Sequence, residues 1–190
     1  TVRDWQDGSG FDQIRQQRGE RQLGFGAGEV LLWLRQTLPV LAVVHGRGLV
    51  HGDVNPRNVM RRDSDGLPIL LDFGLLQAEG EAPLAGASPA YAPRAQGRQE
   101  STAAWMDLHA LGVMALVLLS GREPQSLLDP DGQGWIWPDG LELHDAFRDV
   151  LERLLAEEPQ RRYEAASAVL KASHLVCTAQ AKPLGQVAWL

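Results

Sequence analysis

The amino-acid sequence predicts an α+β fold that is mainly α-helical and carries one or two small β-hairpins. In several stretches the apolar residues recur at three- and four-residue steps, the spacing that places them on one side of a helix. A charged turn that ends in Asp65-Gly66 separates two short apolar runs, which is typical of a β-hairpin. The chain has 190 residues, which favours one domain with its own hydrophobic core.

We expect helices where the three- and four-residue spacing is sustained, over residues 11–18, 29–45, 103–119, 145–156 and 165–175. In the second of these, Glu29 suits the positive end of the helix dipole, and Pro39 should kink or divide the helix. Gly46 should end it. The stretch 103–119 is apolar on almost every side, which predicts a buried helix, so Asp107 within it requires hydrogen-bond partners.

The predicted organisation is a main domain with a short segment at either end. Residues 1–10 should form an extended, hinge-like segment, because Gly8 and Gly10 interrupt regular elements. Residues 11–175 form the domain, and residues 176–190 form a C-terminal tail or linker. Because the first residue is not Met, we expect these residues to be a piece of a longer chain.

The composition excludes several classes of protein. Apolar residues make up 44% of the chain, too many for a disordered protein, and the net charge of −6 argues against non-specific nucleic-acid binding. The single cysteine, Cys177, excludes an internal disulfide and a cysteine-rich zinc site, and it fits a reducing, cytoplasmic compartment. The longest apolar run, residues 110–119, is too short to cross a bilayer, so we expect no membrane segment.

The candidate functional residues surround a loop at residues 51–58. Pro56 supplies no backbone N–H, which argues against helix there, and the hairpin that follows should return Asp72 to the side of Asp53 and Asn58. Two carboxylates and one amide oxygen around one cavity suit Mg²⁺, and a free carboxylate can accept the proton of an attacking hydroxyl. The pattern therefore indicates phosphoryl transfer from a nucleotide, whereas either Asp alone would be interpreted as a turn residue.

Five motifs together resemble eukaryotic-type (Hanks-type) serine/threonine protein kinases of bacteria and cyanobacteria. Residues 51–58 (His-Gly-Asp-Val-Asn-Pro-Arg-Asn) resemble the catalytic loop, and Asp72-Phe73-Gly74 resembles the magnesium-binding triplet. Residues 88–93 (Ser-Pro-Ala-Tyr-Ala-Pro) resemble the end of the activation segment, and residues 107–112 resemble the buried central helix. Residues 158–162 (Glu-Pro-Gln-Arg-Arg) resemble the signature near the C-terminus of the large lobe.

The resemblance implies ATP and Mg²⁺ as cofactors, a protein substrate, and a role for each matched residue. Asp53 orients the hydroxyl or accepts its proton, and Asn55 occupies a second catalytic position. Asn58 and Asp72 hold Mg²⁺, and Gly74 belongs to the nucleotide site. The remaining matches are Ser88 in the substrate loop and three supporting residues, His51, Asp107 and Arg162.

Several positions depart from the kinase pattern. Gly52 stands where many members have an arginine that pairs with a phosphate on the activation segment, so we expect that switch to be absent. Asn55 replaces a lysine that neutralises the transferred phosphoryl group, and an amide cannot supply that charge. Arg94-Ala95 replaces Pro-Glu, so Arg162 should lose its usual carboxylate partner, at about 3–5 kcal/mol for a broken buried pair.

The resemblance covers the large lobe alone. No glycine-rich strand-turn-strand, paired lysine or helix glutamate is found in these residues, so we expect the missing small lobe of the same chain to be a partner. On its own this stretch should have weak activity or none. Two other interpretations stay open: a pseudokinase that works as a protein-binding module, and a small-molecule kinase of the aminoglycoside-phosphotransferase type.

Overall fold

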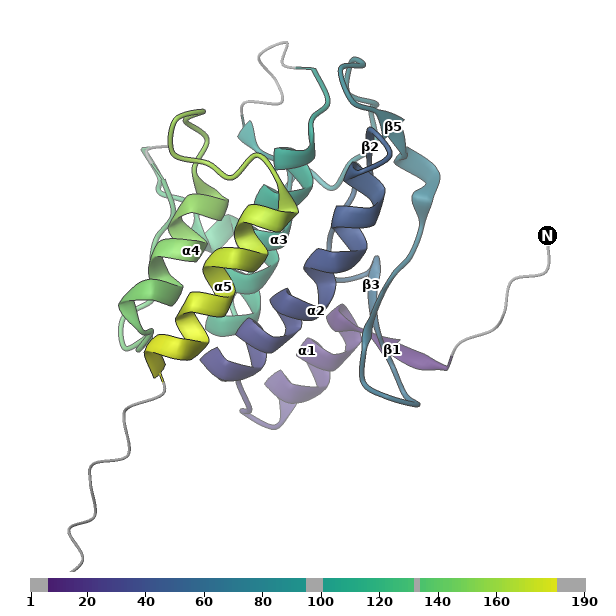
Figure 1. Ribbon diagram of the computed structural model, residues 1–190. Helices are drawn as coiled ribbons and strands as arrows, with labels where there is room; N and C mark the ends of the chain where they lie inside the picture. Colours follow the sequence, from purple (N-terminus) through teal and green to yellow (C-terminus); the bar gives the residue numbers. More distant parts are fainter. Residues whose placement is uncertain (1–6, 95–100, 132–133, 181–190) are drawn as a thin grey trace, which may run out of the picture.

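The computed structural model describes residues 7–94, 101–131 and 134–180, and its helices pack side by side with two small sheets along one edge (Figure 1). The α-helices are α1 (Phe11–Glu20), α2 (Ala27–His45), α3 (Ala104–Ser120), α4 (Asp145–Leu155) and α5 (Ala166–Gln180). The strands are β1 (Gly8–Gly10), β2 (Leu49–Val50), β3 (Val59–Arg62), β4 (Pro68–Leu70) and β5 (Gln77–Ala78). Two short 3₁₀ turns, η1 (Phe73–Leu75) and η3 (Pro124–Leu127), complete the elements used below.

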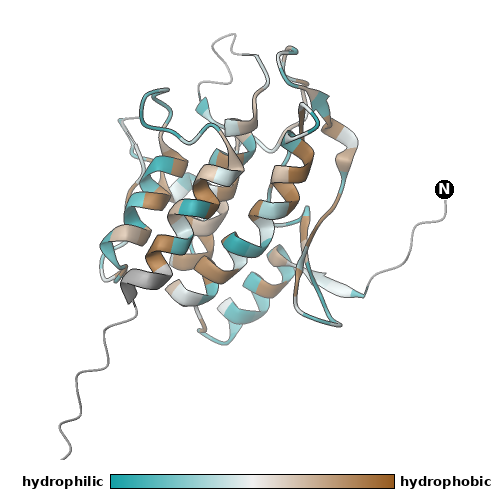
Figure 2. Cartoon of the chain, viewed as in Figure 1, coloured by the Kyte–Doolittle hydropathy of each residue, from teal (hydrophilic) through white to brown (hydrophobic). Residues whose placement is uncertain are grey.

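Helix α3 forms the centre of the molecule, because all its residues from Ala104 to Leu119 are buried. It packs against α2 and α4, and α5 packs against both of those helices. Gly112 allows α4 to come close, since a Cβ at that position would lie 2.8 Å from the Leu154 Cβ. Figure 2 shows more hydrophobic residues along α2 than along the outer helix α1, as the core position of α2 requires.

The predicted hairpin is present, and it belongs to a three-stranded antiparallel sheet. Strands β3 and β4 pair with Val59 opposite Leu70, and β1 pairs with the other edge of β3. The expectation that Gly8 and Gly10 interrupt regular structure is wrong. The missing side chain is what permits the pairing, because a Cβ on Gly8 would lie 2.5 Å from the Arg61 carbonyl oxygen.

Two helices differ from their predicted form. Helix α2 runs without a break through Pro39, so it is not divided there. Helix α5 extends to Gln180 rather than ending at residue 175. Val176 was assigned to the tail, but it is fully buried, seven residues after the buried Val169 and therefore on the same face of the helix.

By length and composition, α2 also meets the criteria for a membrane-spanning helix, with 19 residues and a mean hydropathy of 1.4. A core helix passes the same test. In this fold the side chains of Val30, Leu34, Leu38 and Leu41 are fully buried against the rest of the domain.

Candidate active site

The loop 51–58 joins β2 to β3, and the buried helix α3 holds its first residues. The Asp107 carboxylate accepts hydrogen bonds from the backbone N–H groups of His51 (2.8 Å) and Gly52 (2.9 Å). The His45 ring nitrogen Nε2 lies 2.9 Å from the same carboxylate. Asp107 is only 1% exposed, and these three partners provide the hydrogen bonds that a buried carboxylate requires.

The His51 side chain connects this loop to the strand that precedes Asp72. Its Nδ1 accepts a hydrogen bond from the Asp53 N–H (3.3 Å), which leaves Nε2 as the protonated nitrogen. Nε2 donates to the Leu71 carbonyl oxygen at 3.0 Å. The ring also packs edge-on against Phe73, with 4.9 Å between centroids. One buried imidazole therefore fixes the distance between the two segments that carry the candidate carboxylates.

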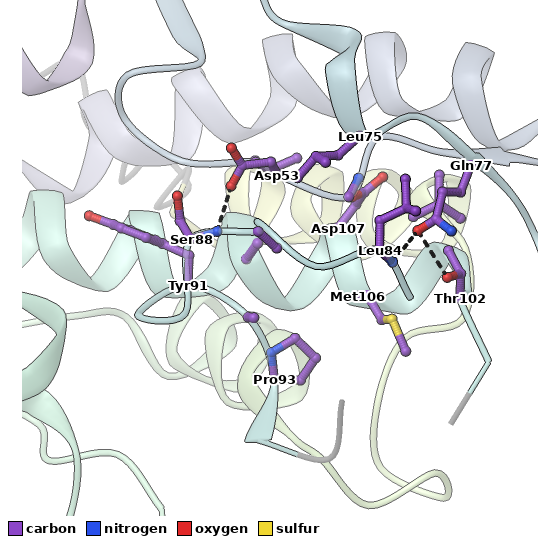
Figure 3. Close-up of a pocket in the computed structure, with 16 residues that line it drawn as sticks. Asp53, Leu75, Gln77, Leu84, Ser88, Tyr91, Pro93, Thr102, Met106 and Asp107 are labelled. Atoms are coloured by element: carbon purple, nitrogen blue, oxygen red, sulfur yellow. Dashed lines mark hydrogen bonds between the residues drawn. The ribbon is translucent and has the colours of Figure 1, made fainter. Parts of the chain in front are cut away.

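Asp53 and Asn58 contact each other directly. The Asn58 Nδ2 donates to the Asp53 carboxylate (2.8 Å) and to the Asp53 carbonyl oxygen (2.9 Å). The other carboxylate oxygen accepts from the Ser88 N–H at 2.8 Å, as Figure 3 shows. Each carboxylate oxygen still has a free lone pair for a substrate hydroxyl. Nothing in the described residues donates to the Asn58 Oδ1, which is open to a ligand.

The hairpin places Asp72 beside Asn58. Directly beyond the last paired residues of β3 and β4, the Leu71 N–H donates to the Asn58 carbonyl oxygen at 2.8 Å. Asp72 follows in a left-handed conformation (φ 54°), and its Oδ1 accepts from the Gly74 N–H at 3.1 Å. Asp72 is exposed, so its carboxylate is accessible to a ligand from solvent.

These residues fit a magnesium ion that is shared with phosphate. Among the described residues, no three His, Cys, Asp or Glu side chains form a metal-binding group of their own. Mg²⁺ is typically held by one or two carboxylates together with substrate phosphates and water, and it prefers oxygen ligands. The Asp72 carboxylate and the open Asn58 Oδ1 are such ligands, on two adjacent strand ends.

Asn55 lies inside the loop rather than at its surface. It is 4% exposed, and its Nδ2 donates to the Asp53 carbonyl oxygen (3.1 Å) and the Ser88 Oγ (3.2 Å). Its Oδ1 accepts from the Arg57 N–H at 2.9 Å. Both donor hydrogens of Asn55 are thus engaged within the protein, so the side chain shapes the loop and fixes Ser88. Direct contact of Asn55 with a transferred phosphoryl group stays a prediction.

The structure explains why position 52 is a glycine, which the sequence alone does not reveal. Its φ is +81°, and a Cβ there would lie 2.8 Å from the Leu75 carbonyl oxygen. Any side chain at this position would both strain the backbone and displace the segment that follows Gly74. The arginine that the resemblance led us to expect at this position therefore cannot be accommodated without moving that segment.

Arg162 is anchored on the far side of α3. Its guanidinium lies 3.7 Å from the centroid of the Trp105 ring, and Nη1 donates to the Glu157 carbonyl oxygen at 3.3 Å. The Glu157 carboxylate pairs instead with Arg94 at 3.3 Å. Ala95, on which the expected loss of a carboxylate partner rests, lies outside the described residues.

A cleft of about 610 Å³ opens beside the loop and is bounded by α1, the 88–91 segment and the end of α3. Asn55, Ser88 and Tyr91 line the cleft, and Asn55 also donates a hydrogen bond to the Asp53 carbonyl oxygen. Burial raises the pKa of Tyr91 to about 12, so its hydroxyl stays protonated. Ser88 and Tyr91 also line the smaller pocket that contains Asp53, so the cleft adjoins the pocket of the candidate base.

Sequence reasoning missed two residues of this site. His45 supports Asp107 from 62 positions away, and no local pattern marks such a pair. Gln77, which follows η1, makes side-chain hydrogen bonds across the next loop, although an isolated glutamine carries no sequence signal.

Comparison with known proteins agrees with this geometry. The family model for the protein kinase domain matches residues 6–174. Serine/threonine-protein kinase F of Synechocystis is 37% identical over 150 residues, which are 75% of this chain and 30% of that protein. Serine/threonine-protein kinase PknA of Nostoc is 32% identical over 152 residues, covering 73% of this chain and 26% of that protein.

A solved structure supports the fold. The kinase PK-1 of the Cydia pomonella granulovirus aligns with a TM-score of 0.72 at 18% identity, over 86% of this chain and 64% of that one. The chain spans about a third or less of the two cyanobacterial relatives it matches. The predicted fold class and family resemblance are confirmed, and the chain belongs to the protein kinase family.

Proposed function

We propose that this chain is the large-lobe part of a serine/threonine protein kinase, which transfers the terminal phosphoryl group of Mg-ATP to a protein hydroxyl. The observation that carries the proposal is the direct hydrogen bond between Asp53 and Asn58, with Asp72 on the neighbouring strand end. In this role Asp53 orients the acceptor hydroxyl and takes its proton. The Ser88 N–H and the Asn58 amide hold the carboxylate at a fixed angle for that task.

The Asn58 Oδ1 and the Asp72 carboxylate would hold Mg²⁺ against the nucleotide phosphates. The metal supplies positive charge that neutralises the phosphate oxygens. The protein contributes position: His51 and Asp107 fix the loop, and the Gly74 N–H fixes the Asp72 side chain. Asn55 carries no charge where the kinase pattern has a lysine, so we expect slow transfer rather than none.

A partner must complete the nucleotide site. Phe73, Leu76 and Leu84 are large apolar side chains in the segment that follows Asp72, and they are 46%, 37% and 49% exposed. Such a group of exposed apolar residues fits a covering domain. We propose that the small lobe of the same chain covers them, that residues 1–190 alone have weak activity, and that the protein acts in the cytoplasm.

The decisive experiment compares acceptors. The natural chain that contains these residues is incubated with Mg-ATP and either mixed protein substrates or aminoglycosides. Transfer to protein serine or threonine supports the proposal, and transfer only to small molecules favours the aminoglycoside-kinase alternative. No transfer to any acceptor, together with specific binding of another protein, favours the pseudokinase alternative.

Two variants test the assigned residues. Asp53→Asn should lower kcat by about 10²- to 10⁴-fold, the range for losing a general base. Asp72→Asn should weaken binding of Mg-ATP, measured by titration at several Mg²⁺ concentrations. The control is Asp149→Asn on the exposed side of α4, which should change neither value. Equal activity of Asp53→Asn and the control would refute the assignment.

A further inference from the structure

The segment between Gly74 and Ser88 has no residue that a kinase could phosphorylate. Residues 75–87 contain no Ser, Thr or Tyr, and their only charged side chains are Glu79 and Glu81. An added phosphate is therefore neither available there nor matched by a cation in the segment. Gly52, where related kinases carry the phosphate-binding arginine, contributes no charge either. Something other than a phosphate must hold this segment in place.

The Gln77 side chain spans the loop that follows it. Gln77 is 9% exposed, and its Nε2 donates to the Ala82 carbonyl oxygen at 2.8 Å. Its Oε1 accepts from the Leu84 N–H at 2.9 Å. The orientation of the amide is fixed, because one partner can only accept and the other can only donate. One neutral side chain thus closes residues 77–84 into a loop.

Thr102 attaches the same loop to the start of α3. The Thr102 N–H donates to the Glu81 carbonyl oxygen (2.7 Å), and the Thr102 carbonyl oxygen accepts from the Gly80 N–H (2.8 Å). Glu79 accepts from the Ala104 N–H at 3.4 Å, at the first turn of α3. The loop is therefore fastened to the same helix that supplies Asp107 to the catalytic loop.

The loop that the Gln77 side chain closes, residues 77–84, leads directly to the contacts of Asp53, the candidate base. Four residues after Leu84, the Ser88 N–H donates to the Asp53 carboxylate, and Asn55 holds the Ser88 hydroxyl. Figure 3 shows the Gln77 and Asp53 hydrogen bonds on opposite sides of one pocket. Only residues 85–87 separate these two sets of contacts, so the backbone between Leu84 and Ser88 has little conformational freedom. The hydrogen bonds of Gln77 therefore restrict the position of Ser88 as well.

We propose that Gln77 is a positioning residue that holds the activation segment in place without phosphorylation. The inference rests on the proposed kinase function, because it assigns the regulation of that same site. Gln77 touches no reacting group and acts through Leu84 and Ser88. Hydrogen bonds between neutral groups hold the segment in place as soon as the chain has folded. The enzyme is therefore constitutively active once ATP and substrate bind.

The first test measures order in the segment and does not depend on catalysis. Gln77→Met keeps the side-chain volume and removes the hydrogen bonds of Gln77 to Ala82 and Leu84, together with the longer one from the Thr102 hydroxyl (3.5 Å). Each net hydrogen bond is worth a factor of about 5 in the opening equilibrium, so the loss of the two shorter bonds should accelerate exchange of the Ser88 amide about 25-fold. The control Gln125→Met, at an exposed position in η3, should leave the exchange unchanged.

A second variant guards against a folding defect. Leu84 is 49% exposed, so Leu84→Pro removes one N–H donor to Gln77 without disturbing the core. It should accelerate Ser88 exchange about 5-fold, the factor for one hydrogen bond. Thermal unfolding shows which variants are folded, and if Gln77→Met is not, Leu84→Pro decides. Unchanged Ser88 exchange in the folded variants overturns the proposal.

The third test uses the natural chain with a protein substrate. Gln77→Met should raise KM for the protein about 10-fold and leave KM for ATP unchanged, a split that general destabilisation does not produce. Treating the wild-type enzyme with phosphatase should leave its rate unchanged, and loss of activity on that treatment overturns the proposal. If no form of the chain transfers phosphate, the kinase function fails, while the exchange data still decide whether Gln77 braces the segment.

Discussion

Acidification should destabilise the protein through His109, a buried residue of the central helix. Its ring is 1% exposed and lies between Trp105 and Trp135, with centroids 6.3 and 6.0 Å away. Neither ring nitrogen has a hydrogen-bond partner among the described residues. Burial, assisted by the positive charge of Arg94, lowers the pKa of His109 from 6.5 to about 4. Folding therefore requires the neutral ring.

The sign and size of the effect follow from proton linkage. Between about pH 4 and 6.5 the unfolded chain binds a proton at His109 and the folded chain does not, so stability rises with pH in this window. Each pH unit is worth about 1.4 kcal/mol, which gives about 3 kcal/mol over the whole window. Lowering the pH from 7.5 to 5.0 covers the upper part and should cost about 2 kcal/mol.

Urea unfolding at pH 7.5 and 5.0 measures this loss directly. The comparison is His109→Phe, which keeps an aromatic ring between the two tryptophans but cannot take up a proton. The variant should be about 2 kcal/mol less sensitive to the pH change than the wild type. If both proteins lose the same stability, or if the His109 ring titrates near pH 6.5 in the folded protein by NMR, the reasoning is refuted.

Three substitutions test the packing around the site by urea unfolding. Gly112→Ala should cost about 1–2 kcal/mol, because crowding against Leu154 outweighs the gain in helix propensity, and a neutral result would mean that α4 moves freely. Gly52→Ala should lower the free energy of unfolding by about 1–3 kcal/mol, because the backbone at position 52 is left-handed. It should also accelerate exchange of the backbone amides that follow Gly74, and unchanged exchange would argue against close contact with Leu75. Asp107→Ala should cost about 3 kcal/mol, since two buried amides lose their acceptor, unless water replaces it.

The fold was accessible from the sequence wherever a periodic pattern or a turn signal repeats along the chain. Helix α3 and the β3–β4 hairpin were predicted because burial on all sides and an Asp-Gly turn leave local marks. Strand β1 was missed because its pairing depends on the absence of a side chain at Gly8, and local propensity counts such a glycine as a break. The end of α5 was missed because Val176 is held by tertiary packing.

The site divides in the same way. Asp53, Asn58 and Asp72 were identified from spacing, because a loop followed by a hairpin brings chain neighbours together. The hydrogen bonds of His45 and Gln77 depend on which segments the tertiary fold brings into contact. A single polar residue carries no information about such a meeting, so only the folded structure could supply it.

Gly52 and Gln77 are parts of one arrangement. Strand β2 ends at Val50, which pairs with Gln77 of β5. The backbone just after β2 and the backbone just before β5 are therefore adjacent. That adjacency is what brings the Leu75 carbonyl oxygen to the place where a Cβ at Gly52 would be. An arginine at position 52 would force these backbones apart and loosen the β2–β5 pairing that carries Gln77. An arginine at position 52 that binds a phosphate and the hydrogen bonds of Gln77 are therefore mutually exclusive in this chain. Gly52 and Gln77 are the residues that the hydrogen-bonded arrangement requires.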